Sequence, residues 1–253
     1  MITKDVFSTL AELPKLIKVK KLLRPRPGNT RDCLGARVAA NAARIPRRSA
    51  FVCEGQTMDW QHFNAAANRY AAVFRAQGLK RGDAVSVLME NRIDFMVVVI
   101  ALNKLGVIAS LINTSLTGRP LTHCAEITGA HKFLFGEECM DAVADVRSAL
   151  PLADGDYLFV PDCGERTTPD WALNMADAAA LTTADNPPET ADITIEDVAF
   201  YIFTSGTTGL PKAAVLSNRR YLLTASGVQG GGLQLTEDDR LYLCLPLLHG
   251  TGR

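Results

Sequence analysis

The sequence lacks a secretory signal and any apolar stretch long enough to cross a bilayer. Lys4 and Asp5 interrupt the first residues, and no apolar core with a small-residue cleavage site follows them. The most apolar stretch, Phe95 to Leu102, is eight residues long, whereas a membrane-spanning helix needs about 20. These absences predict a cytoplasmic protein that does not span a membrane.

Several motifs that define common classes of site are also absent. The six cysteines form no C-x-x-C pair and only four histidines accompany them, so we expect no zinc site and reduced, buried or half-buried thiols. No G-x-S-x-G segment offers a hydrolase nucleophile, and the glycines at 227 and 230–232 lack dinucleotide-binding spacing. The sequence therefore predicts no metal ligand among the candidate site residues.

The net charge of zero conceals an asymmetry along the chain. Residues 1–81 hold 16 Lys and Arg against 5 Asp and Glu, a balance of +11, whereas residues 82–253 have a balance of −11. Such an asymmetry indicates a basic surface or tail. The interleaved aromatic and basic residues of a nucleic-acid interface are missing, so we expect no nucleic-acid partner.

The basic excess is densest in residues 10–26, where Leu and Ile alternate with Lys and Arg until Pro25 and Pro27 stop the helix. Residues 1–30 are predicted to be a basic amphipathic leader, and residues 31–253 a partial domain. Such a helix can lie on an anionic surface, which predicts peripheral contact of residues 10–26 with the inner face of a membrane. A solvated helix packed on the body explains the same pattern, and the sequence leaves both interpretations open.

Strand-like and helix-like segments alternate from Phe51 onward, which predicts an α/β fold with mostly parallel sheets flanked by helices. Residues 161–196 are polar, hold four prolines, and are predicted to be a long surface connection. The predicted strands cover 84–89, 107–112, 132–135, 157–160 and 198–203, and the predicted helices cover 59–77, 92–104, 117–128, 137–150 and a segment from about 217.

An apolar run at residues 241–249 is typical of a strand that is buried on both faces. Four residues follow it. We therefore expect the chain to be the first part of a larger domain.

A loop dense in glycine and hydroxyl groups follows the strand at 198–203. Glycines let the backbone bend so that successive N–H groups point at one anion, and a lysine adds a compact positive charge. The loop is not a Walker A motif, because Pro211 precedes the lysine. The pattern predicts a phosphate-binding loop, and the alternative is a flexible polar turn. The candidate residues are Thr204, Ser205, Gly206, Thr207, Thr208, Gly209 and Lys212.

The segment from Tyr201 to Lys212 resembles the signature loop of adenylate-forming enzymes, the acyl-CoA synthetase and luciferase superfamily. Those loops usually read Pro-Lys-Gly, whereas Pro-Lys-Ala-Ala here is similar to the fatty acid transport protein and very-long-chain acyl-CoA synthetase branch. Leu88-Met-Glu-Asn-Arg92 and Leu111-Ile-Asn-Thr114 suggest the same branch. Cys244-Leu-Pro-Leu-Leu-His249 resembles the next family motif, which ends in an active-site histidine.

The resemblance implies the first part of the large N-terminal domain of an AMP-binding enzyme and a two-step reaction. A carboxylate attacks the α-phosphate of Mg·ATP to give acyl-AMP and pyrophosphate, and the CoA thiol then displaces AMP. On this resemblance Thr204–Gly209 and Lys212 hold the β- and γ-phosphates, and His249 lies near the reacting carboxylate. The implied partners are a fatty acid, ATP and CoA, with Mg²⁺ accompanying the nucleotide.

The family's later motifs for adenine, magnesium, ribose and the lid lysine are missing from the 253 residues. We therefore expect a long-chain or very-long-chain fatty acid–CoA ligase present as an N-terminal fragment that forms no acyl-CoA alone. Two alternatives stay open. One is a ligase for a bile, aromatic or carnitine-like acid, and the other is a non-catalytic nucleotide- or lipid-binding fragment in fatty acid uptake.

Overall fold

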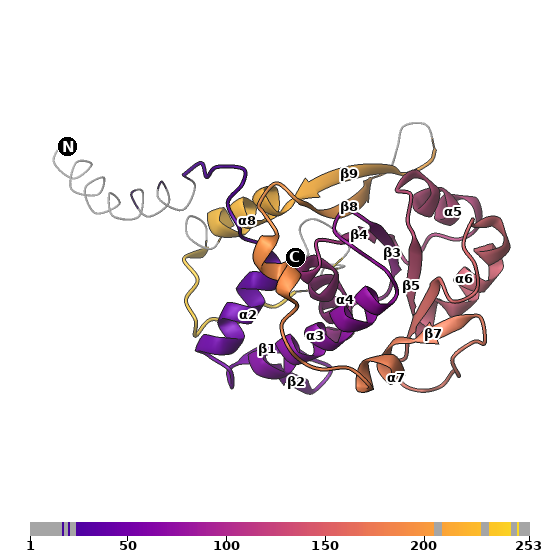
Figure 1. Ribbon diagram of the computed structural model, residues 1–253, viewed down its shortest axis with the longest axis horizontal. Coiled ribbons are helices and arrows are strands. Elements are labelled where there is room, and N and C mark those ends of the chain that lie inside the picture. Colours follow the sequence, from indigo (N-terminus) through magenta and orange to yellow (C-terminus); the bar gives the residue numbers. More distant parts are fainter. Residues whose placement is uncertain are drawn as a thin grey trace, which may run out of the picture.

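A seven-stranded sheet forms the centre of the computed structural model, which describes residues 17, 20, 24–204, 209–228, 233–243 and 247 (Figure 1). The strand order is β7-β6-β5-β3-β4-β8-β9, and β9 alone runs antiparallel to its neighbour in this sheet. The α/β prediction with a mostly parallel sheet is confirmed. The strands are β3 (Ala84–Leu88), β4 (Ile108–Leu111), β5 (Lys132–Gly136), β6 (Tyr157–Val160), β7 (Ala172–Asn174), β8 (Val198–Thr204) and β9 (Lys212–Ser217).

Helices cover both faces of the sheet, because right-handed crossovers between parallel strands place them there. A separate two-stranded hairpin, β1 (Ser49–Cys53) and β2 (Gln56–Asp59), precedes the sheet. The helices are α2 (Leu34–Arg44), α3 (Trp60–Ala76), α4 (Ile93–Lys104), α5 (Gly118–Ile127), α6 (Met140–Val146), α7 (Met175–Ala180) and α8 (Asn218–Gly227), with short helices η1 (Glu137–Cys139), η2 (Arg147–Ala149) and η3 (Pro188–Asp192).

Two apolar clusters lie on opposite faces of the sheet. The larger cluster packs α2, α3, α4 and α7 against one face, and the smaller one packs α5 and α6 against the other (Figure 1). All residues of β3, β4 and β6 are buried, as expected for parallel strands covered on both sides. This burial fixes the strands, and therefore the loops at their ends, in a rigid frame.

The contact between α2 and α4 depends on Gly35. A Cβ atom at this position would lie 2.5 Å from Cγ of Lys104, so the two helices could not approach as closely with any other residue. The Gly35 N–H donates to Oδ1 of Asn103 at 2.9 Å, and Asn103 Nδ2 donates to Oδ1 of Asn218 at 2.9 Å. A buried polar network thus joins α2, α4 and the start of α8.

Several segments differ from the sequence-based expectations. The predicted helix at 137–150 is divided into η1, α6 and η2, and the interpretation of 161–196 as a surface connection is wrong in part. This stretch adds β7 to the sheet, and Met175, Ile193 and Ile195 are buried. Ile193 and Ile195 each lie between polar residues, so the polar composition of the stretch conceals them. The helix α2 and the β1–β2 hairpin were not anticipated.

Residues 241–243 also contradict the prediction of a buried strand. They have no regular structure, and 64% of Leu241 and 91% of Tyr242 is exposed. An apolar run becomes a strand only when it pairs with a neighbour, and no strand of the described ranges pairs with these residues. The five described cysteines are free thiols. Three are buried and Cys53 is half-buried, as predicted, whereas Cys163 is exposed. Within the described residues, no helix is both long and apolar enough to cross a membrane.

Candidate functional site

The carboxyl ends of the parallel strands meet at one edge of the sheet, where open α/β sheets usually bind their ligands. Strand β8 reaches this edge at Thr204 and the chain returns through β9, which begins at Lys212. Thr204 and Lys212 are direct partners in the antiparallel register. The structure therefore brings the first and last residues of the predicted phosphate-binding loop together at the neck of a hairpin.

Lys212 is the first residue of strand β9. The sequence predicted that the loop leads directly into a helix, so the presence of this strand corrects that prediction. The helix does begin where predicted, because Ser217 caps α8 and its side chain accepts from the Arg220 N–H. Lys212 is exposed and forms no ion pair with any residue that the structure describes. Its ammonium group is thus available to an anion at the end of the sheet.

Gly209 has a backbone φ of +88° and open space around its Cα. This left-handed conformation favours glycine, which explains the residue at the position where the loop turns back toward β9. The candidate residues Ser205, Gly206, Thr207, Thr208 and His249 lie outside the described residues. Their assignment stays a prediction.

His123 supports the returning arm of the loop, a role that the sequence did not reveal. The sequence suggested that His123 and Cys124 form the buried end of a helix, and Cys124 is indeed fully buried in α5. The His123 side chain instead lies 3.2 Å from the carbonyl oxygen of Pro211. Because a carbonyl oxygen only accepts, Nε2 of His123 carries the donated proton. No short motif connects residues 123 and 211, so the contact required the fold.

A second polar group lies at the same edge of the sheet, after β3 and β6. Arg92 has a side chain only 10% exposed, donates to the Val160 carbonyl oxygen at 2.9 Å, and lies 3.0 Å from a carboxylate oxygen of Asp162. The neighbouring Glu138 carboxylate accepts the Glu90 backbone N–H at 2.7 Å. These contacts bind the loop after β3 to the loops after β5 and β6.

The Glu137 carboxylate organises the chain after β6 in a similar way. It accepts the backbone N–H groups of Asp162, Gly164 and Arg166 at 2.6, 3.2 and 2.8 Å. The hydrogen bond from Asp162, followed by those from the other amides, lowers the pKa of Glu137, although desolvation opposes the shift. This carboxylate is therefore engaged in holding a loop and is a poor candidate for catalysis.

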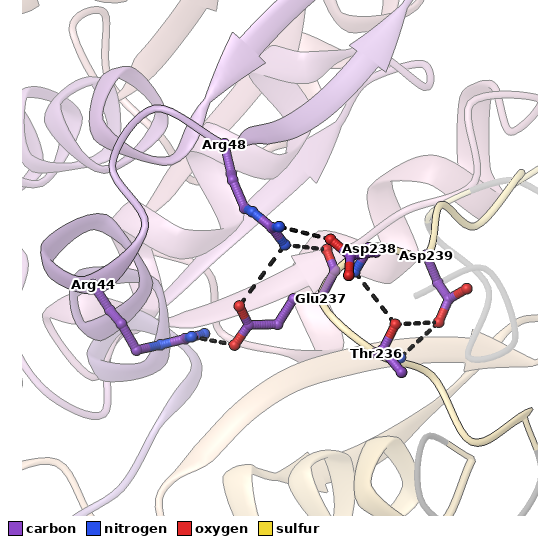
Figure 2. Close-up of polar contacts among 6 residues, drawn as sticks. All are labelled: Arg44, Arg48, Thr236, Glu237, Asp238 and Asp239. Carbon is purple, nitrogen blue, oxygen red and sulfur yellow. Dashed lines mark hydrogen bonds and ion pairs between the residues drawn. The ribbon is translucent and has the colours of Figure 1, made fainter.

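Two arginines near the end of α2 hold the segment at 236–239 (Figure 2). Arg48 donates to the Glu237 carbonyl oxygen at 2.8 Å and to Oδ1 of Asp238 at 2.6 Å, and Arg44 pairs with the Glu237 carboxylate. Thr236 and Asp239 close a local turn, because Oδ2 of Asp239 accepts both the backbone N–H and the hydroxyl of Thr236. The segment that leads toward residue 247 is thus tied to α2.

No group of three His, Cys, Asp or Glu side chains in the described ranges is arranged to hold a metal ion. The described part of the loop offers a hydroxyl group and an ammonium group, which suit phosphate oxygens rather than a cation. The described part of the hairpin therefore places a hydroxyl group and an ammonium group together at the carboxyl end of a parallel sheet.

The chain belongs to the AMP-binding enzyme family, whose model matches residues 38–253. It is 34% identical over 241 residues to the medium/long-chain-fatty-acid–CoA ligase FadD6 of Mycobacterium tuberculosis, covering 95% of this chain and 38% of the relative. It is also 34% identical over 265 residues to long-chain fatty acid transport protein 1 of Mus musculus, covering 100% of this chain and 39% of that protein. The chain thus spans about two fifths of these relatives.

Solved structures show the same fold. The anthranilate CoA ligase AuaEII in complex with anthranoyl-AMP superposes with a TM-score of 0.80 at 22% identity, over 90% of this chain and 42% of that one. The N-terminal domain of FACL13 from Mycobacterium tuberculosis superposes with a TM-score of 0.70 at 27% identity, over 86% of this chain and 52% of that one. The resemblance read from the loop motif is confirmed at the level of the family and the fold.

Proposed function

We propose that this chain carries the ATP-phosphate-binding hairpin of a long-chain or very-long-chain fatty acid–CoA ligase. The observation that carries the proposal is the pairing of Thr204 with Lys212 at the carboxyl edge of the sheet. The names of relatives at 34% identity, a fatty-acid–CoA ligase and a fatty acid transport protein, support the substrate class.

In the proposed reaction the hairpin binds the β- and γ-phosphates of ATP. The exposed Lys212 ammonium and the loop N–H groups offset the charge that develops on pyrophosphate as the fatty acid carboxylate attacks the α-phosphate. The products of this step are acyl-AMP and pyrophosphate, and CoA thiol then displaces AMP to give acyl-CoA. His249 is proposed to lie near the carboxylate. Because the chain spans about two fifths of its relatives, the complete reaction is proposed for a longer protein and not for these residues alone.

Titration calorimetry of the 253-residue chain with Mg·ATP tests the binding step. We expect Lys212→Ala to weaken ATP binding about tenfold, because a charge-assisted contact with phosphate contributes about 1.5 kcal/mol. Inorganic pyrophosphate should compete with ATP, since the hairpin recognises the β- and γ-phosphates.

Lys80→Ala is the matched control for this experiment. Lys80 is also an exposed lysine, but it precedes β3 and therefore lies at the opposite, amino-terminal edge of the sheet. Its loss should leave the ATP affinity unchanged. Equal affinities for Lys212→Ala and the unmodified chain, or no binding of ATP at millimolar concentration, would refute the proposed function.

A further inference from the structure

Strand β9 contains little that specifies how it pairs with β8. None of its residues is fully buried, and Lys212 and Val215 are exposed. Leu216 packs half-buried against the larger apolar cluster, whereas Ala213 and Ala214 offer only methyl groups. A strand without a buried face specifies its register weakly, and a slip by one residue turns every side chain to the other face of the sheet.

The pairing is also irregular at the base of the hairpin, the end away from the phosphate-binding loop. Strand β8 holds one extra residue between Val198 and Phe200, where its register against β9 shifts. A bulge of this kind leaves one residue unpaired and disrupts the ladder locally. The pairing that places Lys212 opposite Thr204 therefore requires an anchor beyond the bulge.

Asn218 provides such an anchor, because it is the first residue after β9 and is only 1% exposed. Its Nδ2 donates to the Thr194 carbonyl oxygen at 3.1 Å, and its backbone N–H donates to the Asp197 carbonyl oxygen at 2.9 Å. Both acceptors lie in the segment that leads into β8. The chain that enters the hairpin and the chain that leaves it are thus joined at one residue.

A third hydrogen bond of Asn218 fixes this junction to the core. Its Oδ1 accepts from Nδ2 of Asn103 at 2.9 Å, and Asn103 is only 2% exposed. Asn103 lies near the end of α4, a helix in which ten of the twelve residues are buried. The position of Asn218 is therefore set by the core and not by the strand that precedes it.

The start of α8 does not itself require Asn218. Ser217 is the cap of this helix, and its Oγ accepts the Arg220 N–H at 3.4 Å. On the other side, the Arg219 side chain is 32% exposed and pairs with the exposed Glu196. Among residues 217–219, Asn218 alone is buried, which favours a positional role for it.

We propose that Asn218 is a positioning residue that sets the register of β9 against β8 and thereby holds Lys212 opposite Thr204. The inference rests on the proposed function only for the role of Lys212. Because side chains alternate along a strand, the register decides on which face of the sheet the Lys212 ammonium lies. Loss of the Asn218 contacts should therefore displace Lys212 without removing any group from the phosphate-binding loop.

Two measurements on the complete 253-residue chain test the proposal, and the first needs no nucleotide. Ile202 and Ala214 are direct partners in the observed register, so their methyl groups should give a cross-strand NOE in NMR spectra. We expect Asn218→Ala to halve this NOE or weaken it further. Asn68→Ala is the matched control, because Asn68 is equally buried and donates to the carbonyl oxygen of Ala184, and it should leave the NOE unchanged.

The second measurement is the affinity for Mg·ATP. Asn218→Ala should weaken ATP binding about fivefold, because the Lys212 ammonium no longer lies at its position. The double variant Asn218→Ala/Lys212→Ala should bind ATP no more weakly than Lys212→Ala alone, since both changes remove the same contact. A general loss of stability would instead add to the effect of Lys212→Ala, and such additivity would contradict the proposed role.

An unaltered NOE between Ile202 and Ala214 in Asn218→Ala would overturn the inference, as would an equal loss in Asn68→Ala. If Asn218→Ala does not fold, hydrogen exchange in the unmodified chain decides. The Asn218 amide should then exchange about tenfold more slowly than the β9 amides that pair with β8, and equal rates would overturn the inference. Failure of the unmodified chain to bind Mg·ATP would count against the proposed function, while the NOE and the exchange rates still decide the role of Asn218.

Discussion

Individual side chains at the end of the sheet hold in place the hairpin strands that end at Thr204 and begin at Lys212. Thr204 and Lys212 were anticipated from the loop motif, because hydroxyl and ammonium groups near glycines suit phosphate oxygens. His123 was not, because it acts on a backbone atom that is distant in the sequence, the Pro211 carbonyl oxygen. A side-chain contact with a remote backbone atom leaves no local sequence pattern.

The contact of His123 leads to a prediction for the hairpin. His123→Phe keeps the ring but removes the proton that Nε2 donates to the Pro211 carbonyl, at a cost of about 1 kcal/mol. We expect the amide exchange of Gly209, Leu210 and Lys212 to accelerate and the ATP affinity to fall about fivefold. His62→Phe removes an exposed histidine of α3 and should have neither effect. Unchanged ATP affinity in His123→Phe would show that the contact does not stabilise the ATP-binding hairpin.

Lys104 provides a second prediction at the scale of a residue. Its side chain is fully buried, and its ammonium nitrogen donates to Oδ1 of Asn64 and of Asn186 at 2.8 and 2.9 Å. Burial lowers the pKa of Lys104 to about 8, whereas the nearby Cys33 acts in the opposite direction. Because the unfolded chain binds this proton more tightly, the contribution of Lys104 to the free energy of unfolding increases as pH rises through about 8 toward the ordinary lysine pKa.

Lys104→Met removes this pH dependence. Between pH 7 and pH 10 the unmodified chain should gain about 2.5 kcal/mol of unfolding free energy relative to the variant. Urea unfolding at the two pH values measures the difference. A difference between the two proteins that stays constant with pH would show that Lys104 does not titrate in this range in the folded state.

At the scale of secondary structure, the sequence predicted buried parallel strands well and edge elements poorly. Strands β3 to β6 are apolar apart from Ser86, Ser110 and Lys132, and this composition identifies them because both faces of the sheet are covered. Strand β9 reads as Lys-Ala-Ala-Val-Leu-Ser, and its pairing with β8 depends on a hairpin that composition alone does not reveal. The apolar segment at 241–243 was misjudged for the converse reason, since its composition favours a strand but the described structure provides no pairing partner.

The ion pairs between α2 and residues 236–239 give a prediction at this scale (Figure 2). Arg48→Ala removes contacts with both Glu237 and Asp238, so the segment containing Arg240 should be cleaved by trypsin several-fold faster. The change is modest because exposed ion pairs contribute about 1 kcal/mol or less. Arg47→Ala, at the adjacent position, should leave the cleavage rate at Arg240 unchanged. Equal rates in the two variants would argue against the contact.

Across the whole molecule, the structure accounts for part of the charge asymmetry. Five arginines of residues 1–81 pair with acidic residues of residues 82–253, so these charges are compensated within the fold. The predicted leader, residues 1–30, carries seven Lys and Arg against two Asp and Glu, and its described residues Ile17 and Lys20 are helical and exposed. The pairs are Arg31 with Asp192, Arg44 with Glu237, Arg48 with Asp238, Arg75 with Glu189, and Arg81 with Asp197.

The leader therefore remains the segment proposed to contact a membrane. We expect the chain to co-sediment with phosphatidylserine-containing vesicles and not with neutral phosphatidylcholine vesicles at low salt. Replacing Lys15, Lys18, Lys20 and Lys21 by Gln should abolish this binding, whereas Arg69→Gln with Lys80→Gln should not. Equal sedimentation with both kinds of vesicle would contradict an electrostatic membrane contact.

Binding of ATP phosphates at Lys212 is the central claim, and covalent labelling tests it most directly. An acyl-phosphate derivative of ATP transfers its acyl group to a lysine amine that lies beside the bound phosphates, and mass spectrometry identifies the modified residue. Labelling is predicted at Lys212, with suppression by excess ATP or pyrophosphate and no preference for Lys80. Labelling spread evenly over exposed lysines, or labelling of Lys212 that excess ATP does not reduce, would contradict the account.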